Sequence, residues 1–314
     1  LHRRGLNVFV TGSNSELLSK ELASRLTGIH LEIEILPFSF KEFLKARGLS
    51  TDNETTKKEG ILKKTLQEYA NTTGFPEVIV ENENPRLYVK QLFDDVVTKD
   101  IILRYRIRHE ETFREIAETL ISNVSSLTSF NTIRKNFGLG SDHTAKDYLG
   151  YLREAYLLLP LSRFSFKPKE AKKSPKKIYA VDHGFYNFAS LRYSRDTGKL
   201  FENIVAIELK RRGKEFNRDV FYYKSQEGYE VDFVLKDGLK IEQLIQMCTE
   251  FESENTERRE IRALLHASKQ LKCKNLLMIT ESKEGEEKIK WFGMERKIRF
   301  TPLWKWLVGM PQNI

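Results

Sequence analysis

The chain has 314 residues, a formal net charge of +9 and an isoelectric point near 9.3. No apolar run approaches the ~20 residues that cross a bilayer, and no signal-peptide pattern is present, so we expect a cytoplasmic protein without membrane contact. The two cysteines, Cys248 and Cys273, lack the spacing of a metal site and fit a reducing compartment. At this length two or three compact units are expected. The excess of basic residues favours a polyanionic partner such as DNA.

The first residues have the pattern of a buried strand followed by a helix. Residues 6–10 are apolar, residues 11–15 are small and polar, and a periodic segment follows at 16–26. This pattern predicts a strand with small polar side chains at its carboxyl end, then a helix capped by Ser13 or Ser15. Ligands of open α/β sheets lie at such strand ends. A parallel strand needs neighbours, so its partners were either lost from this chain or belong to a sheet built elsewhere.

Three stretches of the N-terminal region carry a family resemblance. They read Val-Phe-Val-Thr-Gly-Ser-Asn-Ser-Glu-Leu-Leu at 8–18, Arg-Leu-Thr-Gly at 25–28 and Leu-Pro-Phe-Ser-Phe-Lys-Glu-Phe at 36–43. Together they resemble the sensor-1 region of prokaryotic AAA-type ATPases, a family that also carries a characteristic C-terminal region. The resemblance to that family covers nearly all of the chain.

The resemblance implies that Asn14 is the polar nucleotide sensor near the γ-phosphate, with Arg25 nearby. Ile29 stands where the family normally has an arginine, and the alternative for Asn14 is a turn residue that bonds its own backbone. Complete members bind ATP and Mg²⁺ through a P-loop and a Walker B strand. This chain contains no Gly-x-x-x-x-Gly-Lys-Ser/Thr, so we expect it to bind no nucleotide and to be unable to hydrolyse ATP. A separate protein partner is one source of the missing ATPase half.

A helical region with a hinge follows. An amphipathic helix is expected at 59–70, and a second helix from Pro85 to about Tyr105. Between them the family places a Gly-Phe-Pro-Glu element as the link out of the ATPase lid, so 73–83 is interpreted as a hinge. We expect residues 1–75 to be the end of the ATPase core and its lid, and residues 76–108 to be a helical linker.

Residues 109–177 have the pattern of a winged helix-turn-helix. Helices are expected at 113–121, 130–137 and 142–157, with the third in the recognition position. The lysine-rich segment 162–177 has the composition of a basic wing that lies along phosphates. Nine side chains are candidates for nucleic-acid contact: Lys146, Arg153, Arg163, Lys167, Lys169, Lys172, Lys173, Lys176 and Lys177. Only two of them lie on the third helix, which is sparse for reading bases, so a protein-interaction module is the alternative.

Residues 178–314 contain a pattern of alternating helices and strands. A strand, a helix and three further strands are expected at 178–186, 200–213, 220–224, 229–235 and 240–249. This order, with Glu202 on the helix and Asp232 in mid-strand, resembles the restriction-endonuclease-like domain found in the same ATPase family. The fold class expected for the chain is therefore multidomain α/β: the end of a P-loop ATPase sheet with its helical lid, a winged helix-turn-helix and an endonuclease-like α/β domain.

In active members of the endonuclease fold, one strand acid and a Glu-x-Lys pair on the next strand bind a divalent cation and polarise water. The resemblance assigns Asp232 to the first acid and Glu202 to the auxiliary helix acid, and both to a Mg²⁺ site. Gln246 stands where the second acid belongs, and Cys248 stands where the lysine belongs. A neutral amide is a weaker ligand and a thiol has no fixed positive charge, so a degenerate, inactive core is expected.

Two functions from different classes stay open. The first is a non-catalytic nucleic-acid- or partner-binding portion of an AAA-type ATPase, in which Asp232 and Glu202 are a buried polar pair that supports the fold. The second is a divalent-metal-dependent DNA nuclease in which Gln246 takes the place of an acid. The same strand also carries Lys240 and Glu242 upstream of Gln246, and Glu250 follows, which leaves another alignment of the site open.

Overall fold

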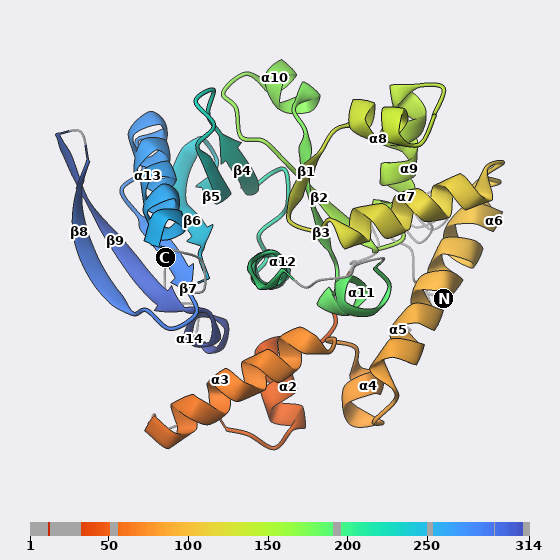
Figure 1. Cartoon of the computed structure of the whole chain (residues 1–314), viewed down its shortest axis with the longest axis horizontal. Coiled ribbons are helices and arrows are strands. Elements are labelled where there is room, and N and C mark those ends of the chain that lie inside the picture. Colours follow the sequence, from red (N-terminus) through yellow and green to blue (C-terminus); the bar gives the residue numbers. More distant parts are fainter. Residues whose placement is uncertain are drawn as a thin grey trace, which may run out of the picture.

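The computed structural model describes residue 12 and residues 33–50, 56–190, 196–249, 254–291 and 293–309. Over these residues the chain forms a mixed α/β structure with two β-sheets, one of three strands and one of six (Figure 1). This confirms the predicted multidomain α/β class. Within the described part, no helix is long and apolar enough to cross a bilayer. The strand expected at 6–10, the helix expected at 16–26, Asn14 and Arg25 lie outside the described residues.

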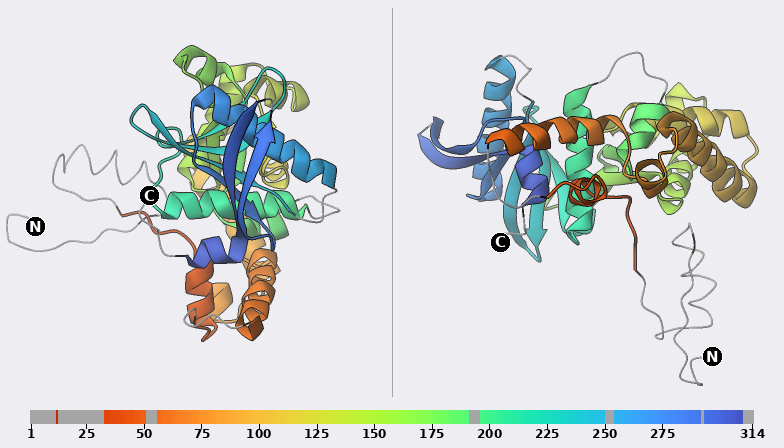
Figure 2. Two further views of the ribbon diagram at one scale, coloured as in Figure 1. Left: turned by 90° about the vertical axis from the view of Figure 1, so that its left-hand side faces the viewer. Right: turned by 90° about the horizontal axis from the view of Figure 1, so that it is seen from below.

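The N-terminal part is helical. Its helices are α2 (Phe40–Ala46), α3 (Thr56–Asn71), α4 (Pro76–Val80), α5 (Pro85–Asp95), the π-helical η2 (Val96–Ile102) and α6 (Leu103–Tyr105). Ser39 begins α2 through a capping box with Glu42, which satisfies two free backbone N–H groups. Figure 2 shows α2 and α3 projecting below the two sheets. The segment expected as a hinge, 73–83, contains the short helix α4.

The middle part alternates helices with the strands of the smaller sheet. Its elements are α7 (Glu110–Ser122), β1 (Ser126–Thr128), α8 (Phe130–Asn136), α9 (Asp142–Glu154), β2 (Leu158–Ser162), α10 (Pro168–Lys173) and β3 (Lys176–Ala180). Strand β3 lies between β1 and β2 and is antiparallel to both. The side chains of Ser129 and Ser141 accept hydrogen bonds from the backbone at the starts of α8 and α9. The three predicted helices are present, and β1, β2 and α10 are additions to the predicted order.

The strand predicted at 178–186 is shorter than expected. Strand β3 ends at Ala180, and Asp182 caps a short helix, α11 (His183–Phe188), by accepting a hydrogen bond from the backbone N–H of Gly184. An aspartate here satisfies a free N–H of the first helical turn, which explains why the chain leaves the strand. Because β3 begins at Lys176, it also crosses the boundary expected between residues 177 and 178.

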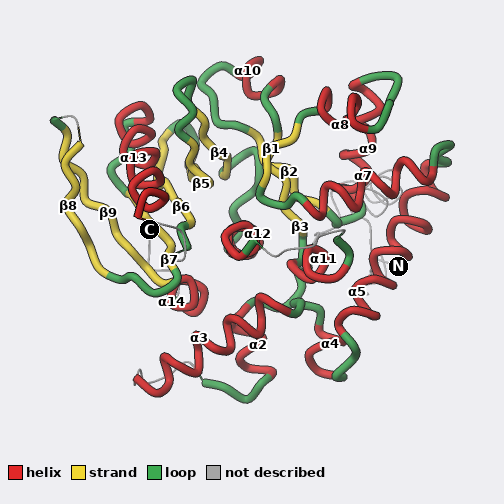
Figure 3. Tube along the Cα trace, in the orientation of Figure 1, coloured by secondary structure: helices red, strands yellow, loops and turns green. Residues whose placement is uncertain are grey.

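The C-terminal part contains the larger sheet. Its elements are α12 (Thr197–Arg211), β4 (Val220–Lys224), β5 (Glu230–Asp237), β6 (Lys240–Met247), α13 (Glu254–Leu271), β7 (Leu276–Thr280), β8 (Gly285–Trp291), β9 (Met294–Pro302) and α14 (Leu303–Val308). The strand order is β4-β5-β6-β7-β9-β8 (Figure 3). Strand β7 is parallel to β6 and β9, and the other neighbours are antiparallel. Helix α13 forms the crossover that the parallel pair β6 and β7 requires.

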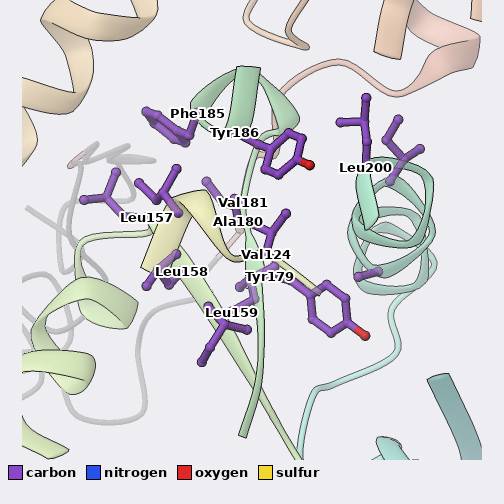
Figure 4. Close-up of a cluster of buried hydrophobic side chains, with 14 of the residues drawn as sticks. Val124, Leu157, Leu158, Leu159, Tyr179, Ala180, Val181, Phe185, Tyr186 and Leu200 are labelled. Atoms are coloured by element: carbon purple, nitrogen blue, oxygen red, sulfur yellow. The ribbon is translucent and has the colours of Figure 1, made fainter. Parts of the chain in front are cut away.

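Apolar side chains of the larger sheet alternate between two cores, because successive strand residues point to opposite faces. On β6, Leu244 belongs to the core that includes residues of α13, whereas Ile245 belongs to the core that includes residues of α12. This second core continues into the smaller sheet, and Figure 4 shows Tyr179 and Leu200 among its members. Helix α12 contacts both β3 and β6 and so lies between the two sheets (Figure 1).

The two sheets are also joined directly by hydrogen bonds. The backbone N–H of Phe164, just after β2, donates to the carbonyl of Tyr222 on β4 at 2.6 Å. The hydroxyl of Tyr222 donates to the carbonyl of Pro175, just before β3, at 2.7 Å. Asn217 Nδ2 donates to the carbonyl of Pro160 on β2 at 2.9 Å. These contacts fix β2 and the start of β3 beside the larger sheet.

Candidate functional site

A pocket of about 450 Å³ is lined by residues of α12, β5, β6 and α13. Glu202 of α12, Asp232 of β5 and Gln246 of β6 all line it. The structure therefore brings together the three side chains that the endonuclease resemblance assigns to one site. Lys240 and Glu242, which another alignment of the site would use, do not line this pocket.

Asp232 lies at an irregularity of β5. Asp232 and Phe233 together lie opposite the single residue Tyr222 of β4, an arrangement that forms a β-bulge. Bulges re-aim side chains and are common beside functional sites. The carboxylate is buried, and its Oδ2 accepts a hydrogen bond from the backbone N–H of Met247 at 2.9 Å. The neighbouring strand therefore fixes the orientation of this acid.

A buried lysine occupies the centre of the acidic cluster. Lys177 Nζ lies 2.7 Å from Asp232 Oδ1, 2.9 Å from Glu202 Oε1 and 3.1 Å from Glu230 Oε1. Burial alone would lower the pKa of Lys177, but the three carboxylates outweigh it and hold that pKa well above the usual range. Only 2% of the residue is exposed. The expectation that Lys177 contacts a phosphate on a basic wing is therefore wrong, because its ammonium is enclosed by protein.

Glu202 and Glu230 share this lysine but differ in their surroundings. Glu202 Oε1 also accepts a hydrogen bond from the hydroxyl of Tyr179 at 2.6 Å. Burial, together with the neighbouring Asp232 charge, raises the pKa of Glu202 to about 8. Burial acts in the same direction on Glu230, but the charges of Lys177 and Lys224 outweigh it and lower the pKa of Glu230. Glu202 is therefore a weaker acid than Glu230, although both contact the same lysine.

Gln246 connects the cluster to α13. Its Oε1 accepts a hydrogen bond from the backbone N–H of Asp232 at 3.1 Å, and its Nε2 donates to Glu260 Oε2 at 2.8 Å. The amide orientation follows from these partners, because a backbone N–H only donates and an ionised carboxylate only accepts. Cys248 is buried and lines the same pocket, and Glu250 lies outside the described residues.

The side chains of this pocket do not fit a divalent cation. Such an ion takes several oxygen ligands whose lone pairs are free to face it. Here Asp232 is engaged by both Lys177 and the Met247 N–H, and the amide oxygen of Gln246 is engaged by the Asp232 N–H. Among the residues that the structure describes, no group of three or more His, Cys, Asp or Glu side chains is placed to hold a metal ion. This geometry gives no support to the Mg²⁺ that the resemblance implies at Asp232 and Glu202.

Three members of the cluster have signals in the sequence that motif matching does not use. Lys177 and Tyr179 are two residues apart on β3, so they face the same side and both reach Glu202. Glu230 likewise precedes Asp232 by two residues on β5. Glu260 has no such signal. It lies on α13, and its contact with Gln246 depends on how that helix packs, which residue spacing does not predict.

The other candidate basic residues lie in the middle part of the chain. Six of them are exposed: Lys146, Arg153, Lys167, Lys169, Lys172 and Lys173. The last three lie on α10, the segment between β2 and β3 at the top of Figure 1. Lys176 is half-buried and its Nζ donates to Ser162 Oγ and to the carbonyl of Ala171. Arg163 is also only partly exposed.

Comparison with protein-family models divides the chain into three matched regions. Residues 1–44 match an AAA domain, which confirms the predicted relation to AAA-type ATPases. Residues 63–197 match a domain of unknown function, DUF8612, and residues 197–304 match another, DUF4143. No solved structure is significantly similar to the chain.

Two curated proteins align with most of the chain. An uncharacterised protein of Methanocaldococcus jannaschii, MJ1544, is 39% identical over 315 residues, which cover 98% of this chain and 70% of that protein. An uncharacterised protein of Haemophilus influenzae is 32% identical over 266 residues, which cover 83% of this chain and 62% of that protein. The chain therefore spans only part of the length of both relatives. It belongs to the same family as the Methanocaldococcus jannaschii protein, and the family-model matches make this an AAA-like ATPase family.

Proposed function

We propose that this chain is a non-catalytic, DNA-binding portion of an AAA-type ATPase. Within it, the order α7-β1-α8-α9-β2-α10-β3 and the sheet order β1-β3-β2 support a winged helix-turn-helix with α9 in the recognition position. The order α12-β4-β5-β6-α13-β7 supports a restriction-endonuclease-like unit.

The observation that carries the DNA-binding proposal is the group of exposed lysines on α10. Lys169, Lys172 and Lys173 lie between the two strands that flank the wing, and Lys146 and Arg153 are exposed on α9. In a winged helix these two elements face the same duplex. Phosphate contacts of this kind give affinity without sequence reading, in agreement with the net charge of +9.

The absence of catalysis is proposed from the pocket. A lysine ammonium lies among the carboxylates, a neutral amide takes the position of the second acid, and the residues do not fit a metal. For ATP, the 314 residues contain no P-loop sequence. In this proposal the endonuclease-like unit is a rigid support for DNA or partner binding.

Binding to a short fluorescent DNA duplex tests the proposal. The triple variant Lys169→Ala, Lys172→Ala, Lys173→Ala should bind more weakly than wild type, and the slope of log K against log salt should fall by about 2.7, because each lysine that no longer neutralises a phosphate lowers it by ~0.9. The matched control is Lys288→Ala, Lys290→Ala, Lys297→Ala, which removes the same charge from exposed residues of the β8–β9 hairpin. An equal loss of DNA affinity in the two triple variants would show that only the net charge matters. That outcome would contradict the proposed DNA-binding surface.

Incubation with plasmid DNA and Mg²⁺ or Mn²⁺ tests the second half of the proposal. We expect a salt-sensitive shift of the DNA and no strand breaks. Cleavage by the wild-type chain that Asp232→Asn abolishes would overturn the non-catalytic assignment and establish a nuclease instead.

A further inference from the structure

We infer that Lys177 is a built-in cation of the endonuclease-like pocket, which takes the place that a divalent metal occupies in an active enzyme of that fold and ties the smaller sheet to the larger one. The inference rests on the proposed function in one respect: it treats the pocket as a nuclease-like site that no longer cleaves DNA.

Each N–H donor of the Lys177 ammonium can be matched with one carboxylate partner. A lysine ammonium has three N–H donors, and Lys177 Nζ has three carboxylate partners, Glu202, Glu230 and Asp232, at 2.7–3.1 Å. These carboxylates come from α12 and β5. Those of Glu202 and Asp232 are buried, and that of Glu230 is partly exposed. Buried carboxylates require a compensating cation, and this cluster receives one from its own chain.

The neighbouring residues match a lysine at this position better than a metal ion. Asp232 Oδ2 is occupied by the Met247 N–H, so this acid offers the centre of the cluster one oxygen only. Gln246 places its amide between the Asp232 N–H and Glu260 Oε2. A glutamate at position 246 would direct a second carboxylate oxygen at Glu260, which is unfavourable without a cation between them.

Lys177 lies outside the strand on which the endonuclease resemblance places a lysine, and position 248, where that lysine would stand, is a cysteine. Lys177 is on β3 of the smaller sheet, whereas two of its partners are on β5 of the larger sheet. The hydrogen bonds of Phe164 and Pro175 with Tyr222 bring the end of β2 and the start of β3 to β4 and fix that approach. The ion cluster therefore holds together two units that the family-model boundary near residue 197 separates.

Mn²⁺ binding by variants of the whole chain tests the inference. Lys177→Met removes the ammonium and leaves the carboxylates, whereas Lys176→Met removes the adjacent, half-buried lysine of the same strand, whose Nζ donates to Ser162 and Ala171. Electron paramagnetic resonance should detect no Mn²⁺ binding by wild type or Lys176→Met, and a bound ion in Lys177→Met. Thermal unfolding should show that Mn²⁺ raises the melting temperature of Lys177→Met alone. Adding Gln246→Glu to Lys177→Met should tighten the binding.

A second variant keeps the test decisive if Lys177→Met folds poorly. Lys177→Met combined with Asp232→Asn removes the cation and one carboxylate together, so it should be more stable than Lys177→Met alone. Mn²⁺ binding by the wild-type cluster would overturn the inference. So would a Lys177→Met protein of wild-type stability, or one that neither Mn²⁺ nor Asp232→Asn restores. These measurements contain no DNA, so they fail or succeed independently of the cleavage and DNA-binding tests.

Discussion

Thr73 and Asp182 are 109 residues apart in the chain, yet the hydroxyl of Thr73 donates to Asp182 Oδ1 at 2.5 Å. The backbone N–H of Gly74 donates to the other carboxylate oxygen at 2.9 Å, and Gly184 N–H donates to Oδ1 at 2.7 Å. Asp182 is 1% exposed. One buried carboxylate therefore joins the connection between α3 and α4 to α11, the helix that follows the smaller sheet.

Neighbouring residues strengthen the same junction. Asn187 Nδ2 donates to the carbonyls of Ala70 and Thr72. His183 Nε2 lies 2.6 Å from the carbonyl of Tyr69. Burial lowers the pKa of His183, so the ring is neutral at physiological pH and Nε2 carries the hydrogen that the carbonyl accepts. The N-terminal helices and the rest of the structure are thus held together by polar contacts as well as by packing.

Asp182→Ala should destabilise the protein strongly. It leaves the Thr73 hydroxyl and two backbone N–H groups buried without an acceptor, which should lower the free energy of unfolding by about 3–5 kcal/mol. Urea unfolding followed by circular dichroism measures it. Asp237→Ala, at an exposed aspartate near the β5–β6 turn, is the control and should change stability by less than about 0.5 kcal/mol. Similar midpoints for the two variants would show that the junction contributes little.

Gly184→Ala should disturb the same junction by steric conflict. A Cβ atom built at Gly184 lies 2.6 Å from both Asp182 Oδ1 and Thr73 Cβ, so the hydrogen-bonded groups would have to move apart. We expect the free energy of unfolding to fall by about 1–3 kcal/mol. Gly150→Ala on α9 makes the same chemical change in open space and should instead stabilise the helix by about 0.5–1 kcal/mol. Thermal unfolding of the two variants should therefore shift in opposite directions, and a stabilised Gly184→Ala would rule out the tight approach.

Glu202 should make stability fall as the pH rises. Its pKa is raised from an ordinary value of 4.5 to about 8 in the fold, so between these values the folded state binds more protons than the unfolded state. The stabilising contribution is complete below 4.5 and is lost as the pH rises through 8, at no more than about 1.4 kcal/mol per pH unit.

Glu202→Gln tests this dependence because the amide stays neutral and still accepts from Tyr179. From about pH 5.5 to about pH 8, the variant should lose less stability than wild type in urea titrations. Glu83→Gln, at an exposed glutamate, should follow wild type. Parallel curves for wild type and Glu202→Gln would show that Glu202 does not gain a proton on folding.

Lys146→Ala and Arg153→Ala should distinguish phosphate contact from base reading. Both residues are exposed on α9, and if either side chain neutralises a phosphate, its removal should weaken binding equally for unrelated duplexes and reduce the salt slope by ~0.9. Lys41→Ala on α2, far from α9 in Figure 1, is the control and should leave the slope unchanged. A loss of affinity that depends on the DNA sequence would instead indicate a base contact. Duplexes of different composition are used to measure this dependence.

The sequence predicts the long helices because their apolar spacing and caps are local signals. Ser129 and Ser141 begin two of them at the expected places, as serine caps do. Strand β1 has three residues and α10 lies in a lysine-rich run, so neither has enough periodicity to be recognised. Whether a segment forms a helix or a strand can therefore be predicted where the signals lie within that segment.

The candidate site shows the complementary limit. Glu202, Asp232 and Gln246 are identifiable because the resemblance to the endonuclease-like fold assigns each of them a position, and they do line one pocket. Lys177 resembles its neighbours in a basic run, and only tertiary contacts distinguish it from them. Its burial depends on the approach of β3 to the larger sheet, which is determined by pairings between distant residues.

Strand β3 has a practical consequence for anyone dissecting this protein. A fragment that starts at residue 178 would retain Glu202, Glu230 and Asp232 but not their cation, and a fragment that stops there would end inside a paired strand. If either fragment is insoluble, the cause would be a boundary placed inside β3. The result would not show whether the wing or the pocket can function alone.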